Sequence, residues 1–160
     1  MDVFFEQIVP IKKKGKTILG FVGIWVLALL LCFVAFLFLG SFFIIVSAAA
    51  IYGAFVLSGK LNVEYEYIVT NTTMDVDKII NKSSRKRLLS FEIPSVTRLE
   101  KYNPAVPIKD PIIACNPEDE NAYLMVCEKE GKSAQYLVFA PNAKLQSAIV
   151  KSLPKFIALS

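Results

Sequence analysis

The sequence of 160 residues contains no histidine and only three cysteines, and both shortages narrow its chemistry. Histidine is the commonest general base and metal ligand, so its absence removes the usual starting point for both kinds of site. Cys32, Cys115 and Cys127 show no Cys-x-x-Cys spacing, and a zinc site is therefore not supported. The seven glycines form no phosphate-binding loop. We predict no catalytic, cofactor-binding or metal-binding residues.

Charge is absent from Thr17 to Gly59. An ionised side chain at the centre of a bilayer costs at least about 3 kcal/mol, so a long apolar run without charge is typical of a membrane segment. This run is about twice the ~20 residues that one helix needs to cross the hydrocarbon core. Leu39-Gly40-Ser41 offers a break, and we predict spans over residues 18–39 and 42–57, the second one short.

Lysines flank the apolar run on both sides: Lys12, Lys13, Lys14, Lys16 and Lys60. The connection between the two spans carries no charge. By the positive-inside rule, both termini are then cytoplasmic and the connection lies on the far side of the membrane.

Two other interpretations of the apolar run fit less well. A cleaved signal peptide has an apolar core of only ~7–15 residues, and few soluble proteins hide about 40 consecutive uncharged residues. Small residues suit close contact between helices: Gly20, Gly23, Ala48, Ala49, Ala50, Gly53 and Ala54. They serve either packing of the two spans on each other or homo-oligomerisation.

The first residues combine apolar and polar side chains. Val3, Phe4, Phe5, Ile8 and Val9 are interrupted by acidic and amide groups and followed by the lysines. Met1–Ile11 therefore predicts a short interfacial helix that Pro10 ends, with a partly ordered tail as the alternative.

The net charge of +4 is unevenly distributed. From Leu61 onward the chain has 13 Lys+Arg against 12 Asp+Glu, so the basic excess belongs to the flanks of the membrane segment. A nucleic-acid binder carries a strongly basic domain face, and we expect no nucleic-acid partner.

After residue 60, apolar and polar residues alternate in several segments, as is typical of β-strands. Val63, Tyr65, Tyr67 and Val69 alternate with polar residues and predict a half-buried strand. Further strands are expected over residues 74–80, 87–93, 96–102, 121–128 and 133–140, with turns at 70–73, 81–84 and 129–132. Four prolines make residues 103–117 an irregular loop. Asn142 is a good N-cap for a final amphipathic helix that ends before Pro154.

This order of elements resembles a known family. The two spans, a strand pair, the segment Arg85–Val96 with its Ile-Pro-Ser-Val step, an aromatic hairpin and a helix opened by Ala140-Pro141-Asn142 are similar to small bacterial two-span membrane proteins with a cytoplasmic pleckstrin-homology-like (PH-like) domain. The chain is also similar to small two-span proteins of clostridial-type bacteria that carry no assigned function. The resemblance implies seven strands, whereas the pattern above yields about six.

We therefore predict an α+β membrane protein. Residues 1–16 form a cytoplasmic or interfacial segment, residues 17–59 a transmembrane helical hairpin, and residues 61–160 an antiparallel PH-like β domain with a C-terminal helix.

The best charged cluster is Lys82, Arg85, Lys86 and Arg87, at the turn before the third of these strands. In PH domains, an early loop between strands binds lipid headgroups, and the resemblance implies the same place here. Clustered Lys and Arg suit phosphate, so these four are the candidates for contact with a lipid or another anion. The alternative is a solvated turn that keeps an edge strand soluble.

Other reactive groups give weaker patterns. Asp75 and Asp77 share one face of a strand and form either an acid–base pair or a solvent-facing pair. Glu118–Glu120 lacks the alternating spacing of a calcium loop and is expected to be an exposed loop. Cys115 has no base that its spacing selects.

We thus expect a non-enzymatic, membrane-anchored binding or accessory domain that contacts membrane lipids and a protein partner, with the loop 103–117 and the strand edges as contact surfaces. The alternative is an oligomeric structural subunit. An enzyme acting on membrane substrates, using Cys115 or the Asp75/Asp77 pair, is the weakest hypothesis.

Overall fold

The structure, a computed structural model, describes residues 4–13, 15–128 and 133–154. It contains two compact units. The helical unit consists of residues 12–63 together with residues 80–83, and the sheet unit contains the other described residues.

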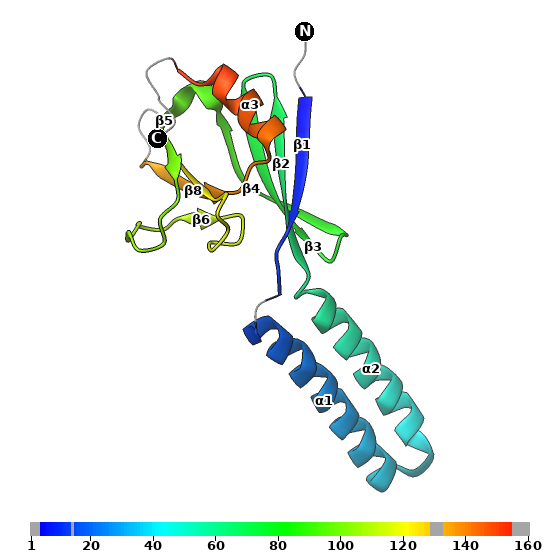
Figure 1. The fold of residues 1–160 in the computed structure, drawn as a ribbon. Helices are drawn as coiled ribbons and strands as arrows, with labels where there is room; N and C mark the ends of the chain where they lie inside the picture. The colour runs from blue at the N-terminus through cyan, green and yellow to red at the C-terminus, as the bar shows by residue number, and fades with distance from the viewer. Residues whose placement is uncertain (1–3, 14, 129–132, 155–160) are drawn as a thin grey trace. The chain divides into compact units, whose positions relative to one another are not determined.

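The helical unit is an antiparallel pair, α1 (Gly15–Phe38) and α2 (Phe43–Gly59), joined by the 3-10 turn η1 (Gly40–Phe42). The helices lie side by side (Figure 1). Gly40 has φ +51°, a conformation that costs glycine little, and the predicted break is confirmed. The second apolar helix is longer than expected, because its apolar stretch of 20 residues begins at Gly40. Both helices are long and apolar enough to cross a membrane.

Small side chains line the contact between the two helices. Ala28, Ala35 and Ala54 are buried there, and the Cys32 thiol donates to the Ser47 carbonyl over 3.9 Å. A Cβ atom on Gly23 or Gly53 would meet no atom within 4 Å. Of the predicted small-residue set, Ala54 is buried in this way, whereas Gly20, Gly23, Ala48 and Ala49 are exposed.

The first residues form a strand, and the predicted interfacial helix is wrong. β1 (Phe4–Pro10) pairs antiparallel with β2 (Val63–Thr70), from Phe4 opposite Thr70 to Pro10 opposite Glu64. Phe5 and Val9 pack against the core, while Phe4 and Ile8 are exposed. Residues 4–11 thus belong to the sheet unit, and the helical hairpin is an insertion between the first two strands of the domain.

The sheet unit contains two four-stranded sheets (Figure 1), with a main core cluster and a smaller second cluster that includes Leu124 and Val138. The first has the order β1-β2-β3-β4, with β3 (Thr73–Ile80) and β4 (Ser84–Glu92). The short 3-10 turn η2 (Ile93–Ser95) leads to the second sheet, ordered β5-β7-β8-β6. Its strands are β5 (Val96–Lys101), β6 (Ile112–Ile113), β7 (Tyr123–Cys127) and β8 (Gln135–Phe139).

The six predicted strands are confirmed to within a few residues, as β2–β5, β7 and β8. Two further strands, β1 and β6, were not predicted from the sequence. The loop 103–117 holds the short β6, which pairs parallel with β8. The predicted turn 129–132 lies outside the described residues.

Two polar side chains tie the core together. The hydroxyl of Tyr67, which is fully buried, donates to the Ala114 carbonyl (2.6 Å) and accepts from the Ala140 N–H (3.3 Å). Its ring meets Phe139 edge-on at 5.8 Å. The Gln7 amide donates to the Ala140 carbonyl (3.0 Å) and accepts from the Asn142 N–H (2.8 Å). β1 is thereby fastened to the start of the last helix.

That helix, α3 (Ala143–Ser152), begins as predicted. The Asn142 side chain accepts from the Leu145 N–H over 2.8 Å, which satisfies one free helix donor. Leu145, Ala148 and Ile149 are buried, so the amphipathic face predicted from their spacing covers the core.

Candidate functional site

The turn between β3 and β4 has an unusual backbone. Asn81 and Lys82 both have positive φ, 52° and 55°, and the Ser83 N–H donates to the Ile80 carbonyl over 3.2 Å. This is the type I′ hairpin turn, which asparagine and glycine favour. A lysine in the left-handed region costs roughly 1–2 kcal/mol relative to the right-handed region.

This turn is part of the helical unit. The Asn81 N–H donates to the Asn62 carbonyl over 2.8 Å, directly after α2. A Cβ atom on Gly59 would lie 2.9 Å from the Asn81 side-chain nitrogen, so the absence of a side chain at residue 59 lets the turn approach the helix end. Lys82 is therefore held at the C-terminal end of α2.

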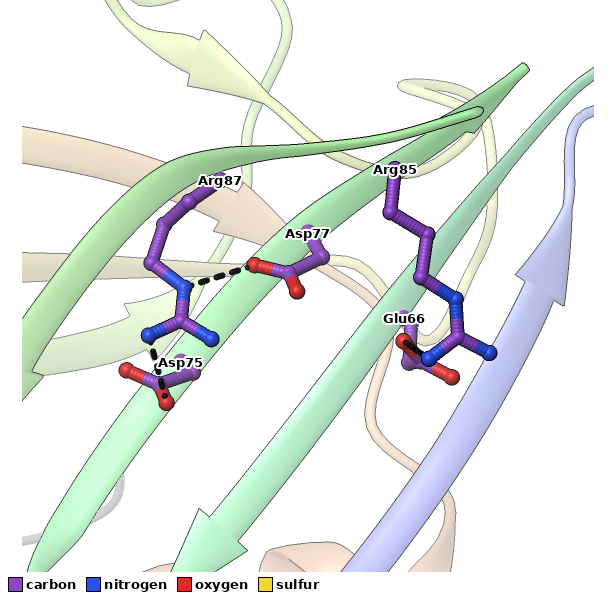
Figure 2. Close-up of polar contacts among 5 residues, drawn as sticks. All are labelled: Glu66, Asp75, Asp77, Arg85 and Arg87. Atoms are coloured by element: carbon purple, nitrogen blue, oxygen red, sulfur yellow. Dashed lines mark hydrogen bonds and ion pairs between the residues drawn. The ribbon is translucent and has the colours of Figure 1, made fainter. Parts of the chain in front are cut away.

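Arg85 lies over a buried carboxylate (Figure 2). It extends from β4 across β3 to Glu66 on β2, where its Nη1 lies 3.2 Å from Glu66 Oε2. The Glu66 side chain is 0% exposed. Burial raises the pKa of Glu66 and Arg85 opposes that shift, while the neighbouring carboxyls of Glu6 and Asp77 raise the pKa further.

Arg87 joins the two aspartates of β3 (Figure 2). Its Nε donates to Asp77 Oδ1 over 2.9 Å, and its Nη1 lies 3.0 Å from Asp75 Oδ2. One planar guanidinium thus bridges two carboxylates with two different nitrogens. Its positive charge is compensated within the sheet.

Comparison with known families matches this architecture to one model over nearly the whole chain. The model described as "Bacterial PH-like domain (DUF6106)" covers residues 1–158. The chain belongs to this family. No curated protein and no solved structure matches it.

The family assignment confirms the resemblance and the fold class, a PH-like domain with two candidate membrane helices. Because the match begins at residue 1, it includes β1 and the inserted hairpin. The hairpin interrupts the connection between the first two strands of this PH-like domain.

The four residues of the predicted basic cluster have different surroundings. Arg85 and Arg87 face carboxylates of neighbouring strands. Lys82 sits at the end of α2, and neither Lys82 nor Lys86 is within salt-bridge distance of an acidic group among the residues that the structure describes.

The groups considered for catalysis have other surroundings. Asp75 and Asp77 hold Arg87. Burial raises the pKa of the Cys115 thiol to about 12, so it stays protonated near neutral pH and is a poor nucleophile. Glu118–Glu120 is exposed, as expected, and Asp119 accepts from the Asn121 N–H over 2.9 Å. The described residues contain no group of three or more acidic or cysteine side chains placed to hold a metal.

A second feature of the PH-like domain was missed by sequence reasoning. A cleft of about 750 Å³ runs along β4 and reaches the end of β7 and the start of β8. Its lining comes from both sheets, so its position depends on long-range strand arrangement that local sequence patterns do not show.

Proposed function

We propose that this PH-like protein is a non-enzymatic binding module anchored in the bacterial plasma membrane, with both termini cytoplasmic and with its lysines against the anionic leaflet. Most large apolar side chains of α1 and α2 are exposed, which suits contact with lipid tails. Five flanking lysines and a connection without charge favour this orientation.

Charge is divided sharply between the two units. Every charged residue among residues 12–63 and 80–83 is a lysine, six in all. The remaining residues carry 12 Lys+Arg against 14 Asp+Glu. A Lys near an anionic membrane surface contributes about 1 kcal/mol, so the helical unit is attracted to such a leaflet and the sheet unit is not.

The observation that carries the proposal is the bond between the turn and the helix end. The Asn81 N–H···Asn62 O contact of 2.8 Å adds Lys82, from a strand turn of the domain, to the lysines at the ends of the two helices. The chain also connects the domain to the hairpin twice, through residues 11–14 and 60–62. Lys82 and the five flanking lysines therefore all belong to the helical unit.

The alternative is an oligomeric accessory subunit, and it is motivated by the predicted small residues that stay exposed on the hairpin: Gly20, Gly23, Ala48 and Ala49. A non-enzymatic role is supported by the protonated thiol of Cys115 and by the use of Asp75 and Asp77 to hold Arg87.

The test is the stability of the full chain in lipid nanodiscs, neutral against anionic. Lys82→Gly relieves the left-handed lysine and should raise unfolding stability in neutral discs by about 1 kcal/mol. It should also shrink the extra stability gained in anionic discs by about 1 kcal/mol, because one surface lysine is lost. Because stability in neutral discs should rise while the additional stability in anionic discs should fall, this one variant separates backbone strain from lipid contact.

The matched control is Lys109→Gly, which removes an exposed lysine from the sheet unit. It should leave the difference between anionic and neutral discs unchanged. The leaflet contact would be refuted if the wild type were no more stable in anionic than in neutral discs. It would also be refuted if both variants reduced that difference equally.

A further inference from the structure

The cleft beside β4 is lined by six consecutive residues of that strand, Arg87–Glu92. Consecutive residues of a strand point to alternate faces, so a cleft that touches all of them runs along the backbone itself. β4 is the last strand in the order of its sheet. Its outer row of N–H and C=O groups faces the cleft with no further strand paired to it among the described residues.

The end of the cleft near η2 is fixed by hydrogen bonds. The Ser95 hydroxyl donates to the Glu92 carbonyl over 2.7 Å, and the Glu128 N–H donates to the Ser95 carbonyl over 3.2 Å. β4, η2 and the end of β7 are therefore joined at this point. A strand entering the cleft meets a preformed edge, which lowers the ordering cost of binding.

The same end carries two carboxylates. Glu92 and Glu128 are exposed lining residues, and no salt bridge joins either of them to a cation within the described part of the chain. Among the described lining residues, Arg87 carries the positive charge, and it is balanced by Asp75 and Asp77. The whole sheet unit also has more acidic than basic residues. Charge therefore favours a cationic ligand at the Glu92–Glu128 end.

We infer that the cleft binds an extended basic peptide segment of a partner protein, which adds as a strand to the free edge of β4. Backbone hydrogen bonds to the edge supply binding, and a Lys or Arg of the peptide lies at Glu92 and Glu128 and supplies selectivity. This inference goes beyond the leaflet contact and uses different residues, so either can fail while the other holds.

The experiment uses the full chain in neutral nanodiscs and defined peptides. The probes are acetylated, amidated decapeptides of alternating Val and Thr with a Lys pair at either end. Their counterparts carry a Glu pair, or the Lys pair with alternate backbone amides N-methylated. Binding is followed by calorimetry, and hydrogen exchange locates the protected amides.

The Lys peptides should bind about tenfold more tightly than the Glu peptides, and N-methylation should abolish binding. Protection should concentrate in residues 87–92. Glu128→Lys and Glu92→Lys should each reverse or erase the preference for Lys, whereas the control Glu120→Lys, an exposed glutamate outside the cleft lining, should not. Lys82→Gly should bind the peptides as the wild type does.

Several results would overturn the inference: equal binding of Lys and Glu peptides, binding unaffected by N-methylation, protection outside β4, or no binding up to millimolar peptide. Protection of residues 87–92 that rises with protein concentration in the absence of peptide would instead identify pairing between two copies of the chain.

Discussion

At the scale of single residues, the sheet unit contains a buried acid whose charge is poorly compensated. Glu66 is 0% exposed, and neither carboxylate oxygen accepts a hydrogen bond among the described residues. Glu6 lies diagonally across from it, since Glu6 pairs with Ile68 and Ile8 with Glu66. The largely exposed Arg85 is the cation at 3.2 Å. Burial therefore decides the direction of the shift in the pKa of Glu66.

This shift makes stability depend on pH. The folded protein holds the Glu66 proton to a higher pH than the unfolded chain does, because its pKa is raised. Stability should therefore fall as pH rises from the ordinary glutamate pKa through the raised one. Glu66→Gln should remove that fall and gain stability at pH 8 relative to pH 4. Urea unfolding at pH 4 and pH 8 measures this change in the free energy of unfolding, with Glu64→Gln as the control. An identical pH slope in wild type and Glu66→Gln would contradict the assignment.

Tyr67 offers a second test at this scale. Tyr67→Phe keeps the ring against Phe139 and removes the hydroxyl that joins Ala114 and Ala140. Two buried backbone groups lose a partner, so the unfolding free energy should fall by about 1–3 kcal/mol. Tyr136→Phe, at a half-buried residue, should change it by less than about 0.5 kcal/mol. Equal effects would show that the Tyr67 hydroxyl contributes nothing.

At the scale of elements, β1 decides whether the domain is complete. It supplies an edge strand, two apolar side chains for the core and the Gln7 bonds to the start of α3. Pro10 fits because β1 is an edge strand, where a missing N–H costs no ladder bond.

We expect a fragment of residues 63–160 to lose cooperative unfolding, because it lacks β1. Residues 1–11 joined to it by a short linker should restore a cooperative transition in urea. In the full chain, Gln7→Ala should cost about 1–3 kcal/mol for its two backbone partners. A fragment without β1 that unfolds as cooperatively as the joined one would refute this role.

Most elements could be predicted from local pattern, and β1 could not. Apolar or aromatic residues alternate with glutamates over Val63–Tyr67 and Asn142 caps a clear amphipathic helix, so β2 and α3 follow from neighbouring residues. Phe4–Val9 fits a helix and a strand equally well. Its partner, β2, lies beyond the whole hairpin, and pairing over that distance leaves no local signal.

The sequence predicted which basic residues form the candidate site, but not which groups they contact. Lys82, Arg85, Lys86 and Arg87 are close in sequence, but which carboxylates they meet depends on strand order. Arg85 reaches Glu66 across β3, and Arg87 reaches Asp75 and Asp77. The contact of Asn81 with Asn62 likewise joins a strand turn to a helix end, which spacing cannot show.

At the scale of the whole molecule, a hairpin of two candidate membrane helices interrupts the PH-like domain. The hairpin follows β1 and precedes β2 in the chain. The two strands that flank the hairpin in sequence therefore also pair with each other in the sheet. All the charges of the helical unit are positive, whereas the sheet unit is slightly acidic. Under the proposed function, the helical unit contacts lipid and the sheet unit is free to bind a partner.

The most direct test is the side of the membrane on which the hairpin turn lies. Ser41→Cys, in η1, and Glu120→Cys, in an exposed loop of the domain, are treated with a membrane-impermeant maleimide in right-side-out and inverted vesicles. The wild type, with Cys115 and Cys127 buried, gives the background. We predict labelling of residue 41 only in right-side-out vesicles and of residue 120 only in inverted ones. Labelling of both residues from the same side would contradict a membrane-spanning hairpin with a cytoplasmic domain.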